Sequence, residues 1–234
     1  MNYFEKVFFA ASLLAQKVRY TISPQKRIHL LGDSLMAGQP WYKYPRTGWG
    51  TQLKAFINSD RIRVINHARN GASTMSFNKF KHFKKALRAI KENDIVIVGF
   101  AHNDQFYKPA NGELVLNVFE ALLTGFVNEL KNQKAIIFLG TPITRYNLSA
   151  DHGSFPEAIK VIAQKTNVGL IDLHAYSEDL QYQLGEEKVK ELYLIAAPGR
   201  FIMHPDGIQD HIHLSPYGAQ VFAKYAADVI NQLI

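Results

Sequence analysis

Residues 28–38 read IHLLGDSLMAG, an apolar run that passes directly into Gly32, Asp33 and Ser34. A short apolar run of this kind predicts a buried strand, and the polar residues after it then lie at the carboxyl end of that strand. A serine hydroxyl is a poor nucleophile until a base takes its proton. If Ser34 has a chemical role, another part of the chain must therefore supply that base.

Four further apolar runs predict buried strands, and together they define the expected fold. The five expected strands cover residues 28–31, 62–66, 95–100, 135–139 and 168–173. Helical patterns separate these runs, and alternating strands and helices indicate a mainly parallel sheet with helices on both faces. The 234 residues contain no linker-like stretch and no internal repeat. We therefore expect a single-domain α/β fold, a three-layer α/β/α sandwich with a mainly parallel five-stranded sheet.

Two segments have clear helical spacing. Residues 77–93 read FNKFKHFKKALRAIKEN, with lysines and arginine around an apolar stripe. The stripe consists of Phe80, Phe83, Leu87 and Ile90. Residues 215–234 begin with Ser215, which suits an N-cap, and Pro216, which suits the first helical position. The apolar stripe that follows predicts a terminal helix docked on the core.

Composition excludes several kinds of chemistry. The chain has no cysteine, which rules out disulfides, thiolate nucleophiles and cysteine-bound zinc. Its net charge of +7 favours anionic partners. The lysine-rich helical face carries no recognised nucleic-acid-binding motif, so we interpret it as a solvated surface and expect no nucleic-acid partner.

The first 27 residues are expected to form a helical extension, and residues 28–234 the catalytic domain. The apolar stretch at residues 7–15 is short for a membrane span, so no stable membrane insertion is expected. We interpret this stretch as an amphipathic helix that packs on the domain, which predicts a cytoplasmic protein. A signal peptide is the alternative, and it would make the protein secreted.

Three polar groups follow the first three predicted strands. Ser34 ends the first, Gly71 lies in NHARNGAS after the second, and Asn103 lies in AHND after the third. Because ligands collect at the carboxyl ends of parallel strands, these residues are expected to share one rim. The N–H groups of Ser34 and Gly71 and the side-chain amide of Asn103 can then donate to an oxyanion, and glycine leaves room for the substrate.

The segment DHIHLSPYG near the chain's end supplies the missing base. We expect Asp210 and His213 in the loop before the terminal helix, where one turn carries both. The carboxylate holds the Nδ1 proton of the imidazole, and Nε2 is left free to take the proton of Ser34. Singly, these residues also suit a helix cap, a turn and a surface histidine. Jointly they indicate an acyl-transfer site.

The motifs GDSL, NGAS, HND and DHIHLS, in order over residues 32–215, resemble those of the GDSL, or SGNH, hydrolase superfamily, a flavodoxin-like fold. The resemblance implies nucleophile and oxyanion donor at Ser34, further donors at Gly71 and Asn103, and acid and base at Asp210 and His213. The stretches TGWG, NHARNGAS and PDGIQDHIHLSPYGA are most similar to rhamnogalacturonan acetylesterases. Where the family usually has glycine before the His-Asn pair, this chain has an alanine.

That alanine is Ala101, and we expect its backbone to avoid positive φ, so that the methyl group merely narrows the pocket. The loop GQPWYKYPRTGWG, residues 38–50, supplies substrate-binding candidates. They are Trp41 and Tyr44 for a sugar ring and Arg46 for an acidic sugar's carboxylate. His102, beside Asn103 in AHND, is a further substrate-binding candidate outside this loop. Trp49, Leu35 and Met36 are expected to pack in the core.

Three rival functions stay open from the residues alone. The histidines and acids at residues 102–104 and 204–213 suggest a metal-dependent phosphoesterase, but the first strand offers Asp33 without a second ligand, so we predict no metal and no cofactor. A lipase of the same fold acting on short-chain lipid esters and a non-catalytic carbohydrate-binding protein are the others. The favoured function is a serine esterase that removes small acyl groups, above all acetyl, from a carbohydrate through an acyl-enzyme. Its expected partner is an acetylated saccharide. The oligomeric state does not follow from the sequence.

Overall fold

The structure is a computed structural model that describes residues 26–107, 114–148 and 152–234. The expected N-terminal extension, including the apolar stretch at residues 7–15, lies almost wholly outside the described residues. None of the helices within the described ranges is long and apolar enough to cross a membrane.

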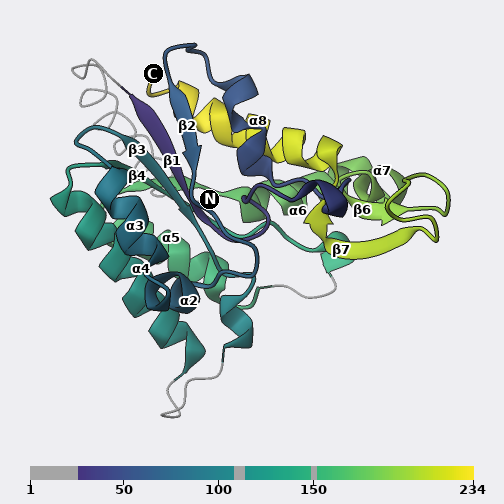
Figure 1. The fold of residues 1–234 in the computed structure, drawn as a ribbon. Helices are drawn as coiled ribbons and strands as arrows, with labels where there is room; N and C mark the ends of the chain where they lie inside the picture. Colours follow the sequence, from purple (N-terminus) through teal and green to yellow (C-terminus); the bar gives the residue numbers. More distant parts are fainter. Residues whose placement is uncertain (1–25, 108–113, 149–151) are drawn as a thin grey trace.

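A five-stranded parallel sheet forms the middle layer (Figure 1). Its strands are β1 (Arg27–Gly32), β2 (Arg63–Asn66), β3 (Ile95–Gly99), β4 (Ile136–Gly140) and β5 (Gly169–Ile171). They lie in the order β2-β1-β3-β4-β5, and every neighbouring pair is parallel. The expected fold class is confirmed, and each strand falls within one or two residues of its predicted bounds.

Helices cover both faces of the sheet (Figure 1). One layer contains α2 (Thr74–Lys79), α3 (His82–Ala89), α4 (Val115–Asn132) and α5 (Phe155–Lys165), and the other contains α6 (Leu173–Leu184) and α8 (Pro216–Asn231). A short helix, α7 (Glu186–Lys190), follows α6. Each face has its own apolar cluster, and the expected core residues Leu35, Met36 and Trp49 are 2–3% exposed. Burial of such side chains on both faces is the main stabilising contribution.

The predicted helix over residues 77–93 is broken into α2 and α3. Lys81, between them, adopts a left-handed conformation with φ of 59°, and Phe80 is 64% exposed rather than buried. Phe83, which belongs to the predicted stripe, is buried, and Phe77 is buried in place of Phe80. Six residues apart on one continuous helix, these two rings would point about 120° away from each other. The break lets both face the core.

An antiparallel pair of strands outside the main sheet was not expected. It consists of β6 (Tyr193–Ala196) and β7 (Ile208–Leu214). The prediction of a loop for Asp210 and His213 is therefore wrong, because both lie on β7. The predicted terminal helix is confirmed as α8, and the Ser215 hydroxyl caps it by accepting the N–H of Gly218 at 3.0 Å.

A row of glycines crosses the sheet at its carboxyl end. Gly32, Gly99 and Gly140 are in register on β1, β3 and β4. A Cβ on Gly32 would lie 2.5 Å from the carbonyl oxygen of Gly99 and 3.0 Å from the sulfur of Met36. Only glycine therefore fits at Gly32, and the segment after β1 can fold down onto the sheet.

Candidate active site

Ser34 lies in the tight turn that follows β1. The carboxylate of Asp33 accepts the N–H of Leu35 at 3.0 Å, and its carbonyl accepts the N–H of Ala37 at 3.0 Å. Ser34 is 7% exposed. The turn thus fixes the hydroxyl at the carboxyl end of the sheet with little freedom to move.

The three side chains expected to form an acyl-transfer site are connected by hydrogen bonds. Oγ of Ser34 lies 3.0 Å from Nε2 of His213, and Nδ1 of His213 lies 2.7 Å from Oδ2 of Asp210. Since a carboxylate only accepts, Nδ1 carries the proton and Nε2 presents its lone pair to the serine hydroxyl. This is the tautomer that a general base requires.

A bulge in β7 brings Asp210 and His213 to the same side. Leu194 pairs with Asp210 and the adjacent Tyr193 pairs with Leu214, so residues 211–213 have no partners on β6. In a regular strand, residues three apart point to opposite faces. Here Oδ1 of Asp210 accepts the N–H groups of Ile212 and His213, both at 3.0 Å, and closes the bulge into a turn.

Those hydrogen bonds also keep Asp210 ionised. Burial raises the pKa of the Asp210 carboxyl, but the hydrogen bonds from the ring and backbone of His213, together with the Ile212 N–H, outweigh burial. The net result is a pKa well below the ordinary range for aspartate. The carboxylate is therefore available to stabilise the imidazolium that forms when His213 takes a proton.

The segments after β1, β2 and β3 are held together at the rim. Gln39, which no sequence motif singles out, donates to the carbonyl of Ser34 at 2.9 Å and to Oδ1 of Asn70 at 2.8 Å. The side-chain amide of Asn103 donates to the carbonyl of Ala72 at 2.9 Å and keeps its second hydrogen for another acceptor. These contacts bring all three predicted oxyanion donors to one end of the sheet.

The backbone conformation at residue 71 requires glycine. Its φ is +71°, which favours glycine, and a Cβ built there meets no protein atom within 4 Å. The space beside Gly71 is thus open, as an approaching substrate would need.

Ala101 differs from the expectation. Its φ is +127°, so the prediction that the backbone avoids positive φ is wrong. Ala101 is fully buried, and its carbonyl accepts the N–H of Asp104 at 3.1 Å, which closes the turn after β3. Holding a residue other than glycine in this region costs on the order of 1–3 kcal/mol. The surrounding packing must offset that strain.

Asp104 fixes the position of the Asn103 turn against α2. Its Oδ1 accepts both the backbone N–H of Thr74 at 2.9 Å and the Thr74 hydroxyl at 2.5 Å. Burial raises the pKa of Asp104 to about 6, although the bonds from Thr74 act in the opposite direction. The sequence offered no signal for this contact beyond the acid in the HND motif.

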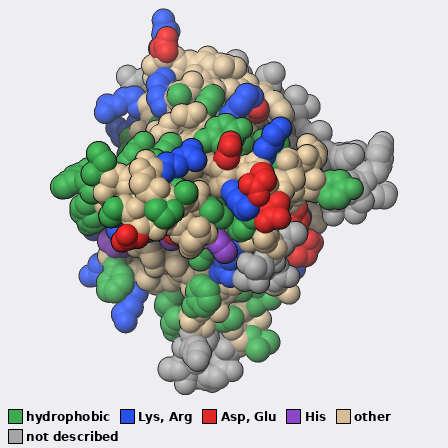
Figure 2. All heavy atoms as spheres, turned by 90° about the vertical axis from the view of Figure 1, so that its right-hand side faces the viewer, with side chains coloured by type: hydrophobic (Ala, Val, Ile, Leu, Met, Phe, Trp, Pro, Cys, Tyr) green, Lys and Arg blue, Asp and Glu red, His purple; other side chains and the backbone are tan. Residues whose placement is uncertain are grey.

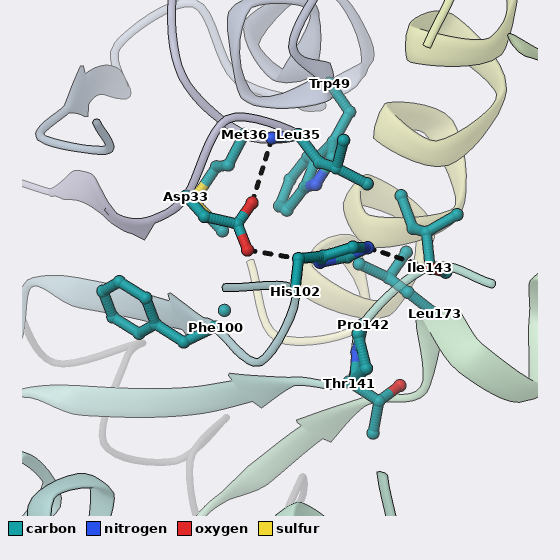
Figure 3. Close-up of a pocket in the computed structure, with 11 residues that line it drawn as sticks. Asp33, Leu35, Met36, Trp49, Phe100, His102, Thr141, Pro142, Ile143 and Leu173 are labelled. Atoms are coloured by element: carbon teal, nitrogen blue, oxygen red, sulfur yellow. Dashed lines mark hydrogen bonds and ion pairs between the residues drawn. The ribbon is translucent and has the colours of Figure 1, made fainter. Parts of the chain in front are cut away.

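His102 lies between the carboxylate of Asp33 and the backbone of Ile143 (Figure 3). Its Nδ1 lies 3.2 Å from Oδ2 of Asp33 and its Nε2 lies 3.0 Å from the carbonyl of Ile143. His102 is 7% exposed, and both of its ring nitrogens lie against groups inside the protein. This position does not suit the substrate contact that the sequence suggested, and His102 instead holds the Asp33 turn in place.

The other substrate-binding candidates line an open cleft of about 290 Å³ beside the site. Trp41 is 76% exposed and Tyr44 is 54% exposed, so both present aromatic surface to solvent. Arg46 lines the same cleft, and its guanidinium Nη2 contacts Nε2 of His213. The face shown in Figure 2 mixes basic and acidic side chains, with hydrophobic side chains gathered toward one side.

No metal centre is visible in the part of the chain that the structure describes. Among those residues, no group of three or more histidine, cysteine, aspartate or glutamate side chains is arranged to hold an ion. The acids and histidines at residues 204–213 that suggested a phosphoesterase do not form such a group.

A parallel α/β/α sandwich that places a serine against an aspartate-held histidine defines a class of hydrolases with a serine nucleophile. Residues 28–226 match the family described as GDSL-like Lipase/Acylhydrolase. The chain belongs to this family, and it is a carboxylic ester hydrolase.

Known relatives agree with this assignment. Rhamnogalacturonan acetylesterase RhgT of Bacillus subtilis (strain 168) is 33% identical over 213 residues, which cover 88% of this chain and 90% of RhgT. The crystal structure of YxiM from Bacillus subtilis superposes over 88% of this chain with a TM-score of 0.73 and 23% identity, and this chain spans 56% of its length. A catalytic mutant of Axe2, an acetylxylan esterase from Geobacillus stearothermophilus, superposes with a TM-score of 0.66 at 19% identity, covering 89% of this chain and 95% of that one. At such identities the two structures show the fold alone.

Proposed function

We propose that this protein is a serine esterase that removes small acyl groups, above all acetyl, from a carbohydrate. The observation that carries the proposal is the unbroken series of hydrogen bonds from Ser34 through His213 to Asp210. Relatives named as rhamnogalacturonan acetylesterases, at 33% and 30% identity, support an acetylated saccharide as substrate. The exposed aromatic side chains of the cleft are suited to stack on a sugar ring.

The reaction proceeds in two acyl transfers. Oγ of Ser34 attacks the ester carbonyl while its proton passes to Nε2 of His213, and the carbonyl oxygen becomes an oxyanion. The N–H groups of Ser34 and Gly71 and the free hydrogen of the Asn103 amide donate to that oxyanion. Its collapse breaks the ester bond, and the departing sugar oxygen takes the proton from His213.

Water then completes the cycle. His213 takes a proton from a water molecule, the resulting hydroxide attacks the acyl-serine carbonyl, and the second oxyanion occupies the same donors. When it collapses, the acid leaves and Oγ of Ser34 recovers its proton from His213. No group outside this chain, apart from substrate and water, takes part in these steps.

A substrate screen with a nucleophile variant tests the proposal. We expect acetyl release from acetylated pectin or xylan, and faster hydrolysis of acetyl than of butyryl or octanoyl 4-nitrophenyl esters. Ser34→Ala should abolish turnover while leaving the thermal transition in place, and a sulfonyl fluoride should label Ser34. Preference for octanoyl esters would favour a lipase, and saccharide binding without turnover would favour a carbohydrate-binding protein.

A further inference from the structure

Arg46 competes with the nucleophile for the catalytic base. A neutral imidazole with its Nδ1 proton donated to Asp210 has one acceptor left, the lone pair on Nε2. Two donors reach that atom, the hydroxyl of Ser34 at 3.0 Å and Nη2 of Arg46. A guanidinium has only donors and keeps its proton, so its contact with Nε2 competes with the hydrogen bond from the serine hydroxyl.

Arg46 also lacks the partner that a half-buried cation usually has. Within the described residues it forms no ion pair with a carboxylate, and its Nε is buried without a hydrogen-bond partner. Burial lowers the pKa of the guanidinium, although the charges of Asp210 and Asp33 act against this shift. A desolvated guanidinium with an unsatisfied donor favours an anion as its partner.

The cleft provides the route by which an anion reaches this cation. Arg46 lines it together with Trp41 and Tyr44, whose rings are exposed to solvent. A carboxylate is planar and accepts two parallel hydrogen bonds from a guanidinium, which is stronger and more directional than one bond to an imidazole nitrogen. A carboxylate in the cleft therefore has the chemistry to draw the guanidinium away from His213.

We propose that Arg46 is a carboxylate-released cap on the catalytic base. In the free enzyme its guanidinium shares Nε2 of His213 with the hydroxyl of Ser34, and a carboxylate bound in the cleft pairs with Arg46 and leaves Nε2 to Ser34 alone. The proposal rests on the esterase function above and adds a regulation to it. Neutral esters meet a capped base, whereas esters on saccharides that carry a nearby carboxylate uncap it as they bind.

The test uses a neutral ester and a separate carboxylate. Hydrolysis of 4-nitrophenyl acetate by the whole chain is measured with increasing galacturonic acid at constant pH and ionic strength, and with galactose as the uncharged control. We expect galacturonic acid to raise kcat/KM saturably, by about 5-fold or more as is usual for coupled sites, and galactose to have no effect. Inhibition, or no response, by galacturonic acid would overturn the proposal.

Variants of Arg46 separate the cap from a structural role. Arg46→Leu and Arg46→Gln should hydrolyse 4-nitrophenyl acetate faster than the unmodified protein and should no longer respond to galacturonic acid. Lys54→Leu removes an equal charge outside the cleft and should keep the response. Slower hydrolysis by both Arg46 variants, with unchanged melting temperatures, would contradict the cap. An unmodified protein that hydrolyses no ester at all would instead remove the proposed function.

Discussion

Two aspartate–histidine pairs lie at the carboxyl end of the sheet, and they differ in what the second ring nitrogen meets. In the pair Asp210–His213, 2.7 Å apart, Nε2 faces the hydroxyl of Ser34. In the pair Asp33–His102, 3.2 Å apart, Nε2 faces a backbone carbonyl. A carboxylate orients the imidazole in both, so orientation alone does not make a base. The ring must also keep a lone pair that faces a proton donor.

The surroundings of the pairs follow the same division. The side chains of Asp210 and His213 are 29% and 19% exposed and lie on the bulge of β7 beside the cleft. Those of Asp33 and His102 are 4% and 8% exposed and lie under the turn after β1. The first pair is placed for chemistry, and the second is placed to hold the nucleophile turn.

Removing each histidine gives the largest contrast. We expect His213→Ala to lower kcat by on the order of 10⁵-fold with little change in melting temperature, because the base is lost and the site is partly exposed. His102→Ala should leave the Asp33 carboxylate short of a partner and destabilise the fold by about 1–3 kcal/mol, with a much smaller loss of kcat. Kinetics on 4-nitrophenyl acetate and urea unfolding measure both. If the two variants lost kcat equally and were equally stable, the distinction between a catalytic and a structural histidine would be wrong.

Asn103 follows His102 in the sequence but points to the rim, so its replacement sharpens the contrast. Asn103→Ala should lower kcat by about 10²- to 10³-fold, the usual cost of one oxyanion donor. KM should change little, since the donor acts on the transition state. Steady-state kinetics and a thermal melt on one purified variant measure both quantities. An unimpaired kcat would remove Asn103 from the site.

Ala101 directly precedes the buried His102 and holds the backbone there at positive φ. Replacing Ala101 tests how much this conformation costs in stability. Ala101→Val should destabilise by about 2–4 kcal/mol, because a branched side chain is strained at positive φ and overfills a buried position. Ala101→Gly relieves the strain, but it removes a buried methyl group and gives the unfolded chain more conformational freedom. Its net effect on the free energy of unfolding should therefore stay within about 1 kcal/mol. The three proteins are compared by their midpoints of urea unfolding, with the dependence of the unfolding free energy on urea concentration held the same for all three. A valine variant as stable as the unmodified protein would show that the position is unstrained.

Acid should lower the free energy of unfolding through His152, a histidine near the buried pair Asp33–His102. Nε2 of His152 donates to the carbonyl of Ile143 at 3.0 Å, and Nε2 of His102 lies 3.0 Å from the same carbonyl. Burial, followed by the charge of His102, lowers the pKa of His152 from 6.5 to about 3. Between those values the unfolded chain binds a proton that the folded chain does not, so stability falls as pH falls from 6.5 toward 3.

The slope from this one group should not exceed about 1.4 kcal/mol per pH unit. Melting temperatures of the unmodified protein and of His152→Gln over this pH range measure it, and the variant should give the flatter curve. Parallel curves would show that His152 contributes nothing to acid sensitivity.

The strands and the placement of the rim residues were predictable because each follows from a local pattern. Buried parallel strands are continuous apolar runs, and the rim residues come directly after them. The nucleophile turn at Ser34 and the cap at Ser215 needed no distant contact to be recognised.

Features that depend on distant contacts were not predictable. The alternating apolar residues Ile208, Ile212 and Leu214 were a signal for β7, but the polar residues among them obscured it. The break at Lys81 depends on which rings reach the core, and the burial of His102 depends on the carbonyl of Ile143 in the segment that follows β4, 41 residues further along the chain. No pattern in the residues next to Lys81 or His102 indicates either contact.

The glycine row at the end of β1, β3 and β4 limits how this enzyme can be altered. Met36 fills the space that side chains at Gly32 and Gly99 would occupy, since a Cβ at Gly99 would lie 2.9 Å from its methyl group. Random mutagenesis for new substrates should therefore recover almost no change at these glycines or at Met36. Accepted changes should instead gather in residues 40–44 and on the outer face of the β6–β7 pair, where exposed side chains can be exchanged without moving the serine. A library restricted to those two surfaces would sample altered specificity with few unfolded members.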